Sequence, residues 1–230
     1  MILVEFTGLP GSGKTTLCDK IEEELRNRKI RVRNLQKGKE IENRIDRILF
    51  SLYTRRLKKA KCNKVLLAEI EELNRLLRKR LFSFWEVKIL EANYRCIKAE
   101  KKGIQVALFD EGCIQYIEAL LRRRPADERV SRLIKEIENK IYASRTVIVY
   151  CELDEQTCYD RILKRGRWCA DLGPDKSVEF CLESLRHRGN NIDLIAGQLE
   201  NVKMIKVSTK DSDSDKAFNE VLDAISTNLN

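Results

Sequence analysis

Residues 8–15 read Gly-Leu-Pro-Gly-Ser-Gly-Lys-Thr, and this stretch near the beginning of the 230-residue sequence decides the fold. Residues 2–6 before it are apolar and β-prone. Leu17, Ile21 and Leu25 after it recur at helical spacing. A strand, a glycine-rich loop and an amphipathic helix are therefore expected in this order, which is the context that a phosphate-binding loop requires.

Each fixed position of this loop has a chemical reason. Glycines let successive backbone N–H groups turn inward around a phosphate, and the start of the following helix adds positive potential. Lys14 can reach the β- and γ-phosphates, and the Thr15 hydroxyl can bind Mg²⁺. The alternative is a glycine-rich turn whose lysine is merely exposed. We expect an ATP and Mg²⁺ site formed by Gly8, Pro10, Gly11, Ser12, Gly13, Lys14, Thr15 and Thr16.

The remaining chain alternates between strand-like and helix-like segments, which predicts an α/β fold with a mostly parallel sheet covered on both faces. Residues 38–102, in contrast, are expected to form a long helical insertion between the second and third strands of a single domain spanning residues 1–230. The four later strands are expected near residues 31–35, 105–109, 146–151 and 204–207. Helical pieces are expected at residues 116–121, 130–141, 180–185, 192–199 and 218–225.

Composition excludes several classes. Ten glycines and three prolines are too few for a turn-dense all-β chain, and no apolar run approaches the roughly 20 residues of a membrane span. Eight scattered cysteines with one histidine, His187, favour reduced thiols over zinc sites, and they disfavour hydrolases that need a catalytic histidine. A cytoplasmic protein is expected.

Positive charge is concentrated in the insertion. Residues 34–102 hold 19 Lys or Arg against 9 Asp or Glu, whereas the formal net charge of the whole chain is +9. Such a surface suits phosphates, nucleic acid or a solvated helical face. Arg44 and Arg47 lie one helical turn apart and are expected to face an acceptor, and the apolar stripe of the insertion suggests a homodimer surface.

A carboxylate pair follows the third predicted strand. Asp110 stands where a strand-end acid could help hold Mg²⁺ or take a proton from an acceptor hydroxyl. Capping of the next helix is the simpler alternative. The adjacent Glu111 also matches a pattern in which a glutamate activates water, so its role stays open between catalysis and plain exposure.

A cluster of arginines follows the fourth predicted strand. Arg161 and Arg165 share one helical face, Gly166 ends the helix, and Arg167 comes next. Guanidinium groups beside a loop suit a lid, here residues 164–188, that neutralises a phosphoryl group during its transfer. A solvated basic helix end is the alternative.

The order of these motifs resembles the P-loop nucleotide kinase superfamily, which includes thymidylate, nucleoside monophosphate and deoxynucleoside kinases. The resemblance covers residues 1–35 and 103–230 and is strongest at the loop. It implies a sheet of order 2-3-1-4-5, Mg²⁺-dependent phosphoryl transfer, and adenine held between the lid arginines and residues 209–214. Thymidylate and deoxynucleoside kinases have arginine directly after the strand-three acid, whereas this chain has Glu111, which would repel a phosphate monoester.

The expected activity is transfer of the γ-phosphoryl group of ATP to a small-molecule acceptor, either a hydroxyl or a phosphate on a nucleoside, a nucleotide or a sugar-like molecule. Lys14, Asp110, Arg161, Arg165 and Arg167 would be catalytic, Thr15 and Asp110 would hold the metal, and Arg44, Arg47 and Glu111 would bind the acceptor. The alternatives are an ATPase that couples hydrolysis to a nucleic-acid or protein partner, and a basic RNA-binding module.

Overall fold

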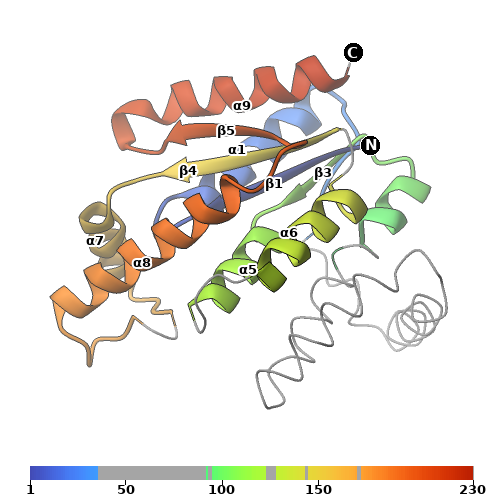
Figure 1. Ribbon diagram of the computed structural model, residues 1–230. Coiled ribbons are helices and arrows are strands. Elements are labelled where there is room, and N and C mark those ends of the chain that lie inside the picture. Colours follow the sequence, from blue (N-terminus) through green and yellow to red (C-terminus); the bar gives the residue numbers. More distant parts are fainter. Residues whose placement is uncertain (36–91, 93–94, 123–127, 143–144, 170–171, 230) are drawn as a thin grey trace, which may run out of the picture.

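A parallel five-stranded sheet of order β2-β3-β1-β4-β5 forms the centre of the protein, as the computed structural model shows (Figure 1). This confirms the predicted architecture and strand order. The structure describes residues 1–35, 92, 95–122, 128–142, 145–169 and 172–229. The strands are β1 (Ile2–Gly8), β2 (Val32–Asn34), β3 (Val106–Phe109), β4 (Thr146–Glu152) and β5 (Lys203–Ser208).

Side-chain alternation along β1 separates two apolar layers. Ile2, Val4 and Phe6 face the layer of α1 and α9, whereas Leu3 faces the layer of α5 and α6. Both layers are visible on the two sides of the sheet in Figure 1. The described helices are α1 (Lys14–Asn27), α5 (Cys113–Leu121), α6 (Glu128–Lys140), α7 (Glu155–Arg165), α8 (Val178–Ala196) and α9 (Ser214–Leu229), with a short 3-10 helix at Asp211–Asp213.

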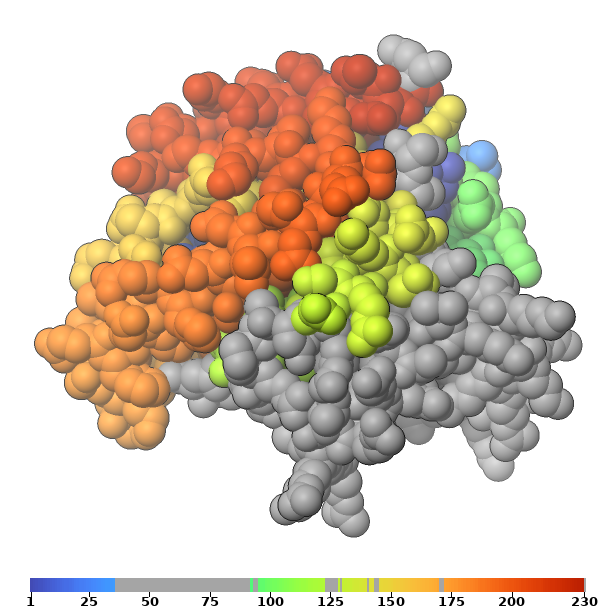
Figure 2. Space-filling model, in the orientation of Figure 1, coloured from blue at the N-terminus to red at the C-terminus, as the bar shows by residue number. Residues whose placement is uncertain are grey.

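Helix α8 corrects the expectation of two separate helical pieces at residues 180–185 and 192–199. One continuous helix runs from Val178 to Ala196, and the Ser177 side chain caps it by accepting from Phe180 N at 3.2 Å. Gly189 lies inside it without breaking it, because an interior glycine costs only about 1 kcal/mol. The segment predicted as a lid, residues 164–188, is therefore helical from Val178 onward. Figure 2 shows α8 crossing one face of the molecule.

A third, smaller core ties the phosphate-binding loop to the α7–α8 hairpin. Leu9 from the loop packs with Cys158 and Ile162 of α7, and with Cys181 and Leu185 of α8. All five residues are buried. The hairpin that carries the predicted lid arginines therefore has an apolar anchor on the loop itself.

The predicted insertion, residues 38–102, lies mostly outside the described residues. So do Arg44, Arg47 and the apolar stripe expected as a dimer surface. Residues 95–101 at its end are helical. None of the helices in the described ranges combines the length and apolar character that a membrane crossing requires.

Candidate active site

The loop between β1 and α1 forms the floor of the site. Gly11 and Gly13 have φ values of +86° and +83°, which lie in the left-handed region that favours glycine. A side chain at Gly11 would also collide with the carbonyl oxygen of Cys158 on α7. Gly8, at the end of β1, is buried beneath the loop. Backbone conformation therefore favours glycine at both Gly11 and Gly13, and close packing against α7 also requires it at Gly11.

Lys14 is the first residue of α1, and its side chain folds back over the loop. Its Nζ atom donates to the carbonyl oxygen of Leu9 at 3.2 Å, and the backbone N–H of Ser12 donates to the same oxygen at 3.0 Å. Lys14 is only 7% exposed, whereas Thr15 and Thr16 beside it are exposed. The start of α1 thus holds one ammonium group and two accessible hydroxyls close to the backbone of the loop.

Asp110 follows β3, the strand adjacent to β1, and meets the start of α1. The Thr15 hydroxyl donates a hydrogen bond to its carboxylate. Burial raises the pKa of Asp110, and this bond together with the charge of Lys14 opposes part of the rise. The Oδ1 atom of Asp110 is buried without a hydrogen-bond partner in the described structure. The structure thus brings Lys14, Thr15 and Asp110 together, as the sequence predicted.

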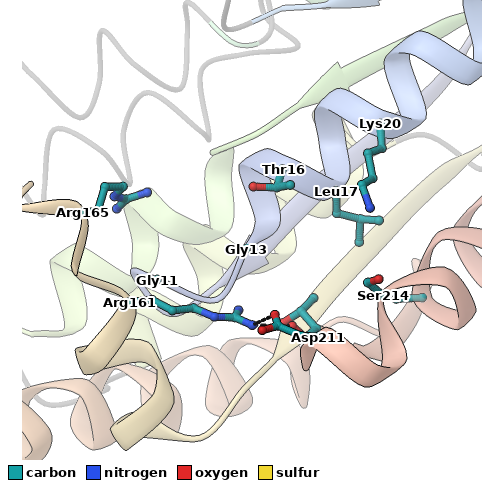
Figure 3. Close-up of a pocket in the computed structure, with 11 residues that line it drawn as sticks. Gly11, Gly13, Thr16, Leu17, Lys20, Arg161, Arg165, Asp211 and Ser214 are labelled. Carbon is teal, nitrogen blue, oxygen red and sulfur yellow. Dashed lines mark hydrogen bonds and ion pairs between the residues drawn. The ribbon is translucent and has the colours of Figure 1, made fainter. Parts of the chain in front are cut away.

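One cavity of about 430 Å³ opens on the α9 side of the loop (Figure 3). Arg161 reaches across it from α7. Its guanidinium lies 2.6 Å from Asp211 Oδ1 and donates to the Thr209 carbonyl oxygen at 3.1 Å. The cavity lies between these arginines and residues 209–214, the region in which the resemblance implies an adenine site. Its lining is Gly11, Gly13, Thr16, Leu17, Lys20, Arg161, Arg165, Thr209, Asp211, Ser214 and Ala217.

A second cavity of about 370 Å³ opens on the α5 side of the same loop. Lys14 and Thr15 line it from the loop, and Glu111 lines it from the turn after β3. Gln115 is fixed there because its Nε2 atom donates to Gly8 O at 2.8 Å and to Thr7 Oγ1 at 3.1 Å. The complete lining is Pro10, Gly11, Gly13, Lys14, Thr15, Thr16, Glu111, Gln115, Tyr116, Glu118, Ala119, Arg122, Arg165, Cys169 and Arg188.

An ion-pair network forms the far wall of this second cavity. Glu118 is buried and lies 3.0 Å from Arg122 Nε, and Asn191 of α8 lies close to it. Burial raises the pKa of Glu118, and the charges of Arg122 and Arg188 oppose the rise. Most of this wall was not predicted, because only Arg188 falls within the segment predicted as a lid, residues 164–188. The spacing of Glu118 and Arg122, four residues apart on an apolar helix, was the available signal.

The three predicted lid arginines differ in position. Arg161 lines the first cavity, Arg165 lines both cavities, and Arg167 lines neither. In Figure 3, Arg165 lies apart from the Arg161–Asp211 pair.

Ser12 is buried in the loop, and its hydroxyl has no hydrogen-bond partner in the described structure.

This architecture is the P-loop kinase fold: a loop between a central strand and a helix, a carboxylate on the neighbouring strand, and an arginine-bearing hairpin over the loop. Two solved structures of deoxyadenosine kinase from M. mycoides share it, one with the products dCMP and a flexible dCDP bound and one with dATP bound. Their TM-scores are 0.52 and 0.51, at 14% identity over 98% of this chain and 100% of the other. This likeness shows the fold. No family model matches the chain, and no curated protein matches it in sequence.

Proposed function

We propose that the protein transfers the γ-phosphoryl group of ATP to a small-molecule acceptor in a Mg²⁺-dependent reaction. The observation that supports this most directly is the pair of cavities on either side of one phosphate-binding loop. Gly11, Gly13, Thr16 and Arg165 line both of them. A donor and an acceptor could therefore occupy separate cavities and meet at the loop. Hydrolysis, in contrast, requires no second organic substrate.

The first cavity is proposed to bind the adenosine part of ATP, with the phosphates in the loop. The backbone N–H groups of the loop and the start of α1 would stabilise the phosphates, and Lys14 would contact the transferred group. Arg161 and Arg165 extend from α7 toward this region, and Arg167 follows on the loop after it. These cations would stabilise the charge that develops on the transferred group.

The residues beside Lys14 fit a divalent cation. Asp110 has a buried oxygen without a hydrogen-bond partner, and the exposed Thr15 side chain supplies a hydroxyl oxygen next to it. Oxygen donors of this kind suit Mg²⁺, which is held by few protein ligands in addition to phosphates and water. We propose that Thr15 and Asp110 hold Mg²⁺, which would neutralise phosphate charge when bound.

The second cavity is proposed to bind the acceptor, whose reacting group would lie near Thr15 and Asp110. A carboxylate with a raised pKa suits the removal of a proton from an acceptor hydroxyl. Glu111 lines this cavity, whereas Arg44 and Arg47 remain predictions because they lie outside the described residues. Since the structures of similar fold are described as deoxyadenosine kinases, nucleosides are the first acceptors to test.

The test is a screen with γ-labelled ATP and Mg²⁺ against nucleosides, nucleotides, sugars and aminoglycoside-like alcohols. A labelled acceptor is expected with the wild-type chain. Lys14→Ala should reduce its formation by about 100-fold or more, corresponding to roughly 3 kcal/mol of transition-state stabilisation. The matched control is Lys216→Ala, on the exposed face of α9. If label passes only to water, and only when nucleic acid or another protein is added, the ATPase alternative replaces this proposal.

A further inference from the structure

A buried carboxylate lies below the second cavity. Glu5, in the middle of β1, is only 1% exposed, and the alternation of the strand directs it into the layer of α5 and α6. The backbone N–H of Ile114 donates to its Oε1 atom at 2.8 Å, and the N–H of Cys113 also hydrogen-bonds to it. The Tyr142 hydroxyl donates to Oε2 at 2.7 Å. One side chain therefore accepts hydrogen bonds from the first turn of α5 and from the end of the α6 segment.

Helix α5 has no capping side chain in its own sequence. Gly112 occupies the N-cap position without a side-chain hydrogen bond, and the first turn contains no acidic residue. A side chain at Gly112 would overlap the Glu5 carboxylate. The group that satisfies the first N–H groups of α5 is thus supplied by a distant strand, and a negative charge at this end of the helix is favourable.

The same helix end carries residues of the second cavity. Gln115 follows Ile114 directly, and its amide is hydrogen-bonded to Thr7 and Gly8 of β1. Glu118 lies one turn further along α5 and lines the cavity. Glu5 and Gln115 together fix α5 against the part of β1 that leads into the phosphate-binding loop.

We propose that Glu5 is a positioning residue: its hydrogen bonds to the first turn of α5 place Gln115 and Glu118 relative to the phosphate-binding loop. The description of this wall as an acceptor site rests on the function proposed above. The hydrogen bonds and their effect on α5 do not depend on that function.

The charge of Glu5 should vary near neutral pH. The titratable groups that face it are Tyr142 after α6, Cys113 of α5, and Cys96 of the 95–101 helix. None of these three groups can carry a positive charge that would stabilise the carboxylate. Burial raises the pKa of Glu5 to about 7, although the hydrogen bonds from Tyr142, Ile114 and Cys113 oppose the rise. A carboxylate accepts stronger hydrogen bonds than a carboxylic acid, so local openings of the first turn of α5 that leave Glu5 buried should become rarer as pH rises through this value. Global unfolding exposes Glu5 to water and should respond to pH in the opposite direction.

The test is amide hydrogen exchange of the full chain by NMR between pH 6 and 8, with each rate divided by the intrinsic rate at that pH. In the wild type, protection of the Ile114 amide is expected to rise about tenfold across this range. In Glu5→Gln, protection of the Ile114 amide at pH 8 should be lower than in the wild type, and it should not change with pH. Glu138→Gln is the matched control, because Glu138 is also buried and accepts a backbone N–H, that of Asn201, but lies on α6. It should retain the wild-type profile.

Positioning is measured separately from stability. The Gln115 side-chain amide signals should shift in Glu5→Gln, while the backbone signal of Gly13 stays in place. If Glu5→Gln does not fold, Tyr142→Phe tests the same proposal, since loss of that hydrogen bond should raise the pH midpoint of Ile114 protection. Unchanged Ile114 protection in Glu5→Gln, or an unchanged midpoint in Tyr142→Phe, would overturn the proposal. Neither measurement requires turnover, so an inactive enzyme would contradict only the proposed function.

Discussion

The Arg161 guanidinium lies 2.6 Å from the Asp211 carboxylate and links α7 to the segment after β5 across the first cavity. Asp211 is 98% exposed in its side chain, whereas Arg161 is 28% exposed. An ion pair this accessible contributes little to stability, typically about 0–1 kcal/mol. Its importance is geometric, because it holds a cation at the mouth of the cavity in which we place the nucleotide.

Arg161→Ala is expected to weaken binding of a non-hydrolysable ATP analogue by about tenfold, because a phosphate-directed cation is lost. Asp211→Asn should leave affinity unchanged or increase it, because the arginine stays and a nearby negative charge is removed. Isothermal titration calorimetry at two salt concentrations measures both variants. Equal weakening in both would mean that the pair acts as a unit that shapes the cavity, and that Arg161 does not contact the phosphates.

Asp110 and Glu111 should separate phosphoryl transfer to an acceptor from hydrolysis. Asp110→Asn is expected to reduce acceptor phosphorylation by about 100-fold or more, because the carboxylate proposed as base or metal partner is lost. Glu111→Gln should have a much smaller effect. Product formation and free phosphate release are measured in parallel. Arrested hydrolysis with trapped ATP in Glu111→Gln would instead identify water as the natural acceptor.

Arg165 should contribute to turnover more than to nucleotide affinity. It lies at the end of α7 and lines both cavities, so it is placed near the point where the two substrates would meet. Arg165→Ala is expected to lower kcat by about tenfold or more, with little change in the KM for ATP. Arg167→Ala is the comparison, because Arg167 lines neither cavity, and its effect should be smaller. A change confined to KM would show that Arg165 only binds ATP.

Glu5 should make stability depend on pH in a defined direction. Its pKa in the folded protein is about 7, above the ordinary value of 4.5, so the folded chain keeps a proton that the unfolded chain has released. The free energy of unfolding should therefore fall as pH rises from about 4.5 to 7. Relative to Glu5→Gln, the wild type should lose roughly 3 kcal/mol over this window. Urea unfolding of both proteins at several pH values measures this; a constant difference would contradict the raised pKa.

The parts of the site that the sequence predicted are those that depend on patterns among neighbouring residues in the chain. The spacing from Gly8 to Thr15 specifies a loop, and Asp110 follows directly from the end of an apolar strand. Arg161 and Arg165 were predicted because helical spacing alone places them together. Even there, the sequence did not distinguish Arg167, which lines neither cavity, from the other two.

The parts that were missed depend on contacts between distant segments. Glu5 looked like one polar residue in an apolar strand, and only the packing of α5 on β1 gives its carboxylate the N–H of Ile114, 109 positions later. Glu118 becomes part of a cavity wall because α8 brings Asn191 and Arg188 beside it. The sequence likewise predicted two helical pieces, at residues 180–185 and 192–199, whereas α8 runs without a break from Val178 to Ala196.

Because Arg165 belongs to the walls of both cavities, their occupants cannot be energetically independent if each interacts with that side chain. Their binding steps then form a closed thermodynamic cycle. If a ligand in the first cavity changes the affinity of the ligand in the second cavity by some factor, the second ligand must change the affinity of the first by the same factor. Whichever occupant arrives first, the ternary complex is reached with the same total free energy.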